Sequence, residues 1–109
     1  MEAVVVLVTA PPEEAEALAG ALVEARVAAC VNLLPGVRSW FWWEGAVDHA
    51  EESLLVIKTT RPRLEALIAA VRDRHSYQVF EAVALPITAG YPPYLEWIDA
   101  SVAGAERPR

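Results

Sequence analysis

Three side chains of this 109-residue sequence are the best candidates to bind a metal ion. Cys30 offers a thiolate, which Cu(I) prefers, and His75 offers an imidazole, which suits Cu(II) and Zn(II). Glu81, six residues after His75, adds an oxygen donor. The three lack the Cys-x-x-Cys or His-Glu-x-x-His spacing that presents several ligands from one rigid element. We therefore expect no high-affinity site within one subunit, although an interface between subunits could assemble one.

Cys30 and His75 also have structural interpretations that involve no metal, and a second histidine, His49, is left out of the site. Cys30 can be a small buried residue at the start of a strand, because free cysteine is among the most buried residue types. His75 can be a proton donor, or a helix C-terminal cap that the helix dipole favours. His49 lies in the acidic stretch 48–52, which we interpret as a solvated charged loop outside the site.

Charged and aromatic residues in apolar segments form a second group of candidates. Lys58 and Glu81 interrupt apolar strands, so we expect a salt bridge between them, an interfacial pocket, or exposure through strand alternation. The aromatic residues would line either a ligand pocket or, as we favour, a subunit interface. The residues predicted for an inter-subunit cleft or interface are Asn32, Trp40, Trp42, Trp43, Lys58, Tyr77 and Trp97.

Composition limits the function. Nine basic against 15 acidic residues give a net charge of -6, which lacks the positive field that nucleic-acid binding needs. No apolar run approaches the roughly 20 residues that cross a bilayer. One cysteine and an N-terminus without a basic leader favour a reducing, cytoplasmic setting. Without a Gly-rich anion loop or a recognisable Ser-His-Asp arrangement, we expect no enzyme.

The same composition, 55% hydrophobic and 22% charged, predicts one folded domain over residues 1–102 and a flexible tail over 103–109. Only two side-chain amides are present, which favours a thermostable protein.

Hydrophobic periodicity predicts the elements that must position these residues. The first half is predicted to contain strand 4–8, a helix capped by Thr9 that ends near Arg26, and strand 28–43 with a bulge or bend at 34–36. After a turn at 44–45, the chain is predicted to form strand 53–59, with 48–52 as its exposed beginning, and a second helix capped by Thr60 and closed by 75–77. Strand 79–88 and a short helix 94–101 complete the predicted order.

This order predicts a ferredoxin-like α+β fold, in which two helices cover one face of a four-stranded antiparallel sheet and a third follows at the C-terminus. The apolar block 4–8 is typical of a strand covered on both faces. However, one helix layer leaves the second sheet face open, and residues 40–43 place aromatic groups on both faces of the long hairpin. We therefore expect an oligomer whose subunits cover these surfaces.

Five ordered segments stand out over roughly residues 3–102, namely Ala28-Ala29-Cys30-Val31-Asn32, Ser39-x-Phe41-x-Trp43-x-Gly45, Glu52-x-Leu54-Leu55-x-Ile57-Lys58-Thr59, His75-x-Tyr77-x-x-x-Glu81 and Tyr94-x-x-Trp97-Ile98. In this order, they resemble the motifs of the CutA divalent-cation tolerance family. The resemblance implies a ferredoxin-like homotrimer similar to PII signalling proteins and an association with tolerance to copper and other divalent metals. Ser76 and Phe80 replace prolines that are usual in the family, and Phe41 replaces a common tyrosine, which puts local geometry and any phenolic role at position 41 in question.

Two functional hypotheses follow. The first is a non-enzymatic cytoplasmic homotrimer that binds copper or other divalent ions through Cys30, His75 and Glu81. The second is a PII-like signalling or scaffolding trimer that binds a small molecule or a protein in clefts between subunits. Neither involves an organic cofactor, a nucleic acid or a membrane.

Overall fold

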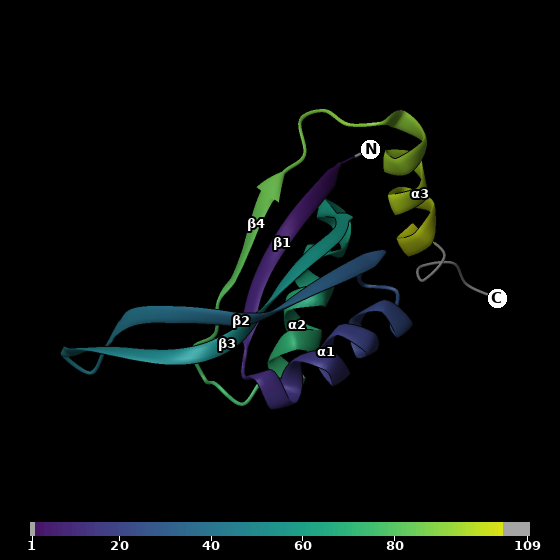
Figure 1. Cartoon of the computed structure of the whole chain (residues 1–109). Coiled ribbons are helices and arrows are strands. Elements are labelled where there is room, and N and C mark those ends of the chain that lie inside the picture. Colours follow the sequence, from purple (N-terminus) through teal and green to yellow (C-terminus); the bar gives the residue numbers. More distant parts are fainter. Residues whose placement is uncertain (1, 104–109) are drawn as a thin grey trace.

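A computed structural model describes residues 2–103 of the chain (Figure 1). Its elements are β1 (Ala3–Ala10), α1 (Pro12–Glu24), β2 (Cys30–Trp43), β3 (Ala46–Thr60), a 3-10 turn (Arg61–Arg63), α2 (Leu64–Arg74), β4 (Ala82–Pro86) and α3 (Pro92–Ala103). The strands form one antiparallel sheet in the order β2-β3-β1-β4, which confirms the predicted ferredoxin-like α+β fold. None of the described helices is long and apolar enough to span a membrane. Ala103 ends α3, and residues 104–109 of the predicted tail lie outside the described residues.

The hydrophobic core lies between the sheet and the α1/α2 layer. Val4, Val6 and Val8 alternate along β1 toward the helices and are buried. They pack with buried residues of β3, α1 and α2, which are Leu55, Ile57, Leu18, Leu22, Leu67 and Val71. The residues between them on β1, Val5 and Leu7, are only partly buried. The expectation that β1 is covered on both faces is therefore confirmed only in part, because α1 and α2 cover one face and α3 covers the other face incompletely.

β2 and β3 form a long hairpin whose distal part extends beyond the helices (Figure 1). Pairing runs from Cys30–Lys58 to Trp43–Ala46, with an irregularity between Leu34 and Val37. The predicted bulge at 34–36 is thus confirmed, as is the turn at 44–45. The acidic stretch 48–52 is part of β3 and pairs with β2, which confirms that it begins the third strand.

Both predicted hydroxyl caps are wrong. Thr9 belongs to β1, and α1 begins after Pro11 without a side-chain capping bond. Thr60 is the last residue of β3, and its side chain does not cap the 3-10 turn that leads into α2. Instead, a proline stands in the first turn of both α1 and the 3-10 turn. The fixed φ angle of proline suits the start of a helix, and proline lacks the N–H group that a side-chain cap would otherwise bind.

Two predicted boundaries also change. β4 covers Ala82–Pro86 rather than 79–88, because only these five residues pair with β1. Pro86 has no N–H to donate, which favours the end of the strand there. α3 begins at Pro92 and ends at Ala103, so it extends the predicted helix 94–101 at both ends.

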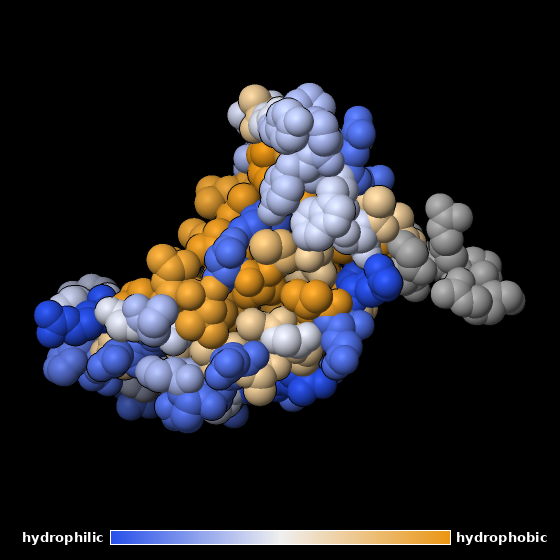
Figure 2. Space-filling model, turned by 45° about the vertical axis from the view of Figure 1, so that its right-hand side comes forward, coloured by the Kyte–Doolittle hydropathy of each residue, from blue (hydrophilic) through white to orange (hydrophobic). Residues whose placement is uncertain are grey.

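The sheet face turned away from α1 and α2, here called the open face, is covered only in part by α3. This helix packs against β1 and β3 and buries Ile98 and Val102. Val83 and Leu85 of β4 remain half-exposed on this face, opposite Leu7 and Val5. Figure 2 shows a continuous hydrophobic area between α3 and the hairpin. Soluble monomers rarely expose large apolar patches, so this face is suited to an interface.

Two glycines allow a matched stability test of the hairpin turn. Gly45 has a φ of +83° and follows Glu44 at +51°, the signs that a two-residue hairpin turn requires. We expect Gly45→Ala to lower the free energy of unfolding by about 1 kcal/mol, because L side chains disfavour this region.

The control is Gly20→Ala in the exposed middle of α1, where an added Cβ meets nothing within 4 Å. It should raise the free energy of unfolding by about 0.5–1 kcal/mol. Urea denaturation followed by circular dichroism, at one protein concentration, measures both. Shifts of the same sign in the two variants would contradict this account of the turn.

Candidate functional site

The structure separates the three predicted metal ligands. Cys30 of β2 pairs with Lys58 of β3, and Lys58 in turn pairs with Val5 of β1. Cys30 therefore lies at the same end of the open face as Val5. The Glu81 carboxylate instead accepts a hydrogen bond of 3.4 Å from Thr9, four residues further along β1 and thus about 13 Å away along the strand. Within residues 2–103, no group of three or more His, Cys, Asp or Glu side chains could hold a metal ion. Cys30, His75 and Glu81 therefore form no common centre in one subunit.

The His75 side chain is buried between α2 and the end of β1. The Tyr77 backbone N–H donates to Nδ1 at 3.1 Å, so Nδ1 is the acceptor. Nε2 then carries the proton and donates to the Thr9 carbonyl at 2.8 Å. The ring also stacks on Phe80, with centroids 5.2 Å apart. Both ring nitrogens are thus used within the chain, and a metal could bind His75 only by replacing one of these hydrogen bonds.

His75 ends helix α2 through its backbone and not through its side chain. Its N–H donates to the carbonyl of Val71 at 2.8 Å, which closes the last turn of α2. Its ring points instead to the backbone of β1, and no dipole interaction is needed to explain its position.

Glu52 is a buried carboxylate that the sequence placed in a solvated charged loop, and that interpretation is wrong for this residue. It is 4% exposed and accepts hydrogen bonds from the hydroxyls of Ser39 at 2.7 Å and Tyr77 at 3.0 Å. Burial, and then the hydrogen bond and charge of Glu52, raise the pKa of Tyr77 to about 12, so its hydroxyl stays a donor at neutral pH. The signal in the sequence was alternation: Glu52 shares a strand face with Leu54 and Val56.

A groove of about 770 Å³ opens beside this carboxylate, between the hairpin and the segment 77–81. It brings together four of the predicted cleft residues, Trp40, Trp42, Trp43 and Tyr77, and the predicted ligand Glu81. Its remaining lining residues are Thr9, Ser39, Phe41, Asp48, His49, Ala50, Glu52, Gln78, Val79 and Phe80. The groove thus combines aromatic walls with acidic groups, and no Lys or Arg lines it.

The other predicted residues gather at the opposite end of the open face. Lys58 Nζ donates to Asn32 Oδ1 and, at 3.4 Å, to the Val56 carbonyl, and Cys30 Sγ lies 3.8 Å from the same amide oxygen. The predicted salt bridge from Lys58 to Glu81 is wrong: within residues 2–103, Lys58 forms no ion pair. Strand alternation leaves Lys58 half-buried rather than fully exposed.

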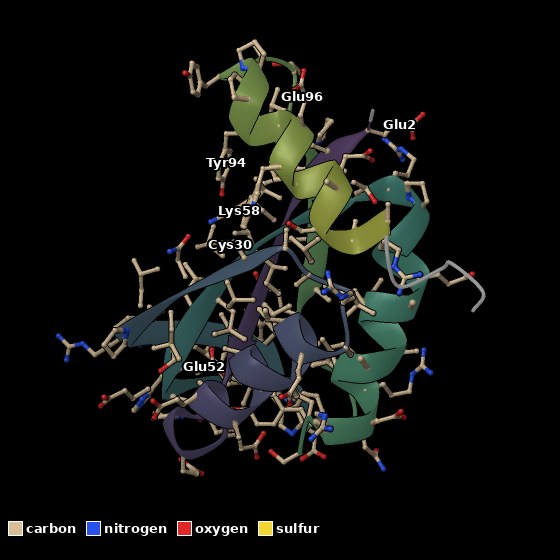
Figure 3. All side chains as sticks on the ribbon, turned by 90° about the vertical axis from the view of Figure 1, so that its right-hand side faces the viewer. Glu2, Cys30, Glu52, Lys58, Tyr94 and Glu96 are labelled. Carbon is tan, nitrogen blue, oxygen red and sulfur yellow. The ribbon has the colours of Figure 1, made fainter. Side chains whose placement is uncertain are left out.

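Tyr94 joins this cluster from α3, although the sequence did not single it out as a site residue. Figure 3 shows its side chain directed toward Lys58 and Cys30. Burial, and then the charge and hydrogen bond of Cys30, raise the pKa of the Tyr94 phenol. Trp97 stacks on Tyr94 with centroids 5.5 Å apart, as their three-residue spacing on a helix permits.

Comparison with protein families places these features in a known group. The family described as CutA1 divalent ion tolerance protein matches residues 4–101. The protein CutA 1, chloroplastic, of Oryza sativa is 48% identical over 99 residues, which are 90% of this chain and 56% of that protein. The divalent-cation tolerance protein CutA of Pectobacterium atrosepticum is 41% identical over 102 residues, 93% of each. The chain spans about half the length of the chloroplast relatives that it matches.

Solved structures agree with the sequence relatives. CutA1 from Oryza sativa superposes with a TM-score of 0.89 at 45% identity and covers 93% of this chain and 94% of that one. Cut A1 from Thermus thermophilus gives 0.89 and 45%, covering 91% and 97%. The PII-like protein CutA from Nostoc gives 0.86 and 31%, covering 94% and 97%. The chain therefore belongs to the CutA1 divalent ion tolerance family.

Proposed function

We propose that this protein acts in divalent-cation tolerance as a non-enzymatic, cytoplasmic homotrimer that binds copper or other divalent ions. The observation that carries the proposal is the position of the partly exposed Cys30 on the open face, beside Lys58 and Tyr94 (Figure 3). A thiol is the ligand type that Cu(I) prefers. One chain provides too few ligands around it, and assembly would add donors from neighbouring copies.

Assembly is supported by the surface that the single chain leaves exposed. Trp42 is 75% exposed and Trp43 48% exposed on the hairpin, and Val83 and Leu85 add apolar area on the open face. Edge strands and apolar patches of this kind are normally covered in soluble proteins. A closed ring of three copies would cover the same surface on every subunit. The likeness to a PII-like CutA structure is consistent with this arrangement.

Metal titration tests the ligand assignment. Metal-free protein is titrated with Cu(I), Cu(II) and Zn(II) against chelators of known affinity. We expect Cys30→Ala to weaken Cu(I) binding at least about tenfold, because the thiolate is the soft donor. Glu81→Gln should weaken Zn(II) binding, whereas Glu65→Gln on the outer face of α2 is the matched control and should not.

His75→Ala is expected to have a smaller effect than Cys30→Ala, because a metal must first displace one of the two ring hydrogen bonds of His75. Equal Cu(I) affinity in Cys30→Ala and the unmodified protein would contradict the proposed site.

A charge in the hairpin tests the trimer. We expect Trp42→Glu to dissociate the assembly, since the new carboxylate would be buried among apolar neighbours. Val23→Glu introduces the same charge at an exposed apolar residue of α1 and should leave the assembly intact. Multi-angle light scattering gives the mass of each variant. A trimer of unchanged mass in Trp42→Glu would show that the hairpin does not form the interface.

A second candidate function is a PII-like sensor or scaffold that binds a small molecule beside the hairpin. The observation that favours it is the groove next to Glu52, which is of the size typical for ligand sites and has aromatic walls and oriented hydroxyls. It predicts a ligand-dependent rise in melting temperature that persists in Cys30→Ala. Thermal-shift screening with a broad metabolite set measures this rise, and the absence of any shift would count against the sensor.

A further inference from the structure

The Glu52 carboxylate is buried without a described basic partner. Its two described hydrogen-bond donors, the Ser39 and Tyr77 hydroxyls, are neutral groups. Burying a carboxylate is costly unless its charge is compensated, and hydroxyl bonds orient it without cancelling the charge. The groove beside it is lined by two further acids, Asp48 and Glu81, and by no Lys or Arg. This end of the open face is therefore complementary to a cation.

Aromatic side chains from two segments line the groove together with this carboxylate. Side chains alternate along the hairpin, so Phe41 and Trp43 lie on the same strand face as Ser39, whose hydroxyl contacts Glu52. Phe80 lines the groove from the segment before β4. Aromatic faces carry a negative quadrupole and attract cations, best when the cation is removed from water.

These features favour an organic cation over a metal ion. Divalent metals require several converging oxygen, nitrogen or sulfur ligands, and no such group of three exists within residues 2–103. An alkylammonium ion requires instead one anionic partner and aromatic faces, and both kinds of group line the groove. The groove volume of about 770 Å³ also suits an organic molecule.

We propose that this groove binds a small organic ammonium compound, with Glu52 as its counter-ion and Phe41, Trp43 and Phe80 as its aromatic walls. Ser39 and Tyr77 act as positioning residues that hold the carboxylate toward the ligand. The inference rests on the second candidate function and names the chemical class of its ligand. It makes no use of Cys30, and the Cu(I) titration of Cys30→Ala is therefore independent of it, whereas Glu81 lines the groove and is not used to separate the two proposals.

The test compares a cation with its neutral isostere. Choline and 3,3-dimethylbutan-1-ol have the same shape, but only choline is charged. Binding is followed by tryptophan fluorescence, since three tryptophans line the groove, and by calorimetry. We expect saturable choline binding at least about tenfold tighter than that of the alcohol, as cation–π contacts and one counter-ion allow.

Two variants locate the site. Glu52→Gln retains the shape of the side chain and removes its charge, and it should weaken choline binding at least about tenfold. Glu51→Gln, at the neighbouring exposed position on the opposite strand face, is the matched control and should bind as the unmodified protein does. Phe41→Leu removes one aromatic wall without touching the carboxylate, so it tests the site even if Glu52→Gln folds poorly, and it should weaken choline severalfold.

Three results would overturn the proposal: no saturable choline binding, equal affinity for the neutral alcohol, or choline affinity unchanged in both Glu52→Gln and Phe41→Leu. Loss of the oligomer in Glu52→Gln together with no choline binding by the unmodified protein would assign Glu52 to the subunit interface instead. These experiments measure ammonium binding. Cu(I) binding and trimer formation are therefore tested separately, by the Cu(I) titration and by light scattering.

Discussion

An antiparallel sheet can leave one face in water when that face is polar, but the face of this sheet that α1 and α2 leave open carries exposed apolar side chains and requires cover. In this chain, α1 and α2 bury one side of β1 and of residues 53–60 of β3, whereas α3 covers only one end of the opposite side. The hairpin adds exposed tryptophans where it extends beyond the helices, so apolar side chains are exposed where the chain provides least cover. This constraint relates the proposed interface between copies, the position of Cys30 and the groove, since all three lie on surface that α1 and α2 do not bury.

The polar groups on the open face are divided between its two ends. Glu52 and Lys58 lie on the same side of β3, six residues and about 20 Å apart. Around Glu52 are hydroxyls, aromatic rings and further acids. Around Lys58 are an amide, a thiol and the Tyr94 phenol, with no carboxylate paired to it within residues 2–103. One face thus offers an anionic, aromatic end and a cationic end, which favours different ligands at each.

The sequence predicted most of the fold because its signals are local. Alternation and helical spacing located the strands and helices, and the turn at 44–45 and the bulge at 34–36 followed from glycine and proline. The errors arose where pairing between strands determines the length of an element. β4 is only as long as its pairing with β1. The hydroxyls of Thr9 and Thr60 cap no helix, because both residues lie in strands.

The candidate site was less predictable for the same reason. Residue type identified Cys30, His75 and Glu81, but only the three-dimensional structure shows that the His75 ring is fully hydrogen-bonded and distant along β1 from the Cys30 end. Glu52 looked like one acid among several in 48–52, and its burial depends on Tyr77, 25 residues later in the chain. Strand alternation places Glu52 on the same face as Leu54 and Val56, but its contact with the distant Tyr77 leaves no periodic signal in one sequence.

Amide hydrogen exchange of the native protein tests most directly whether other copies cover this surface. In the single chain, β2 is an edge strand and its distal residues 38–43 are exposed except for the partly buried Ser39, so their outward N–H groups would exchange quickly. If other copies cover the hairpin, these amides should exchange slowly at concentrations where the protein is assembled and lose protection on dilution. Rapid exchange along β2 at every concentration would contradict the account.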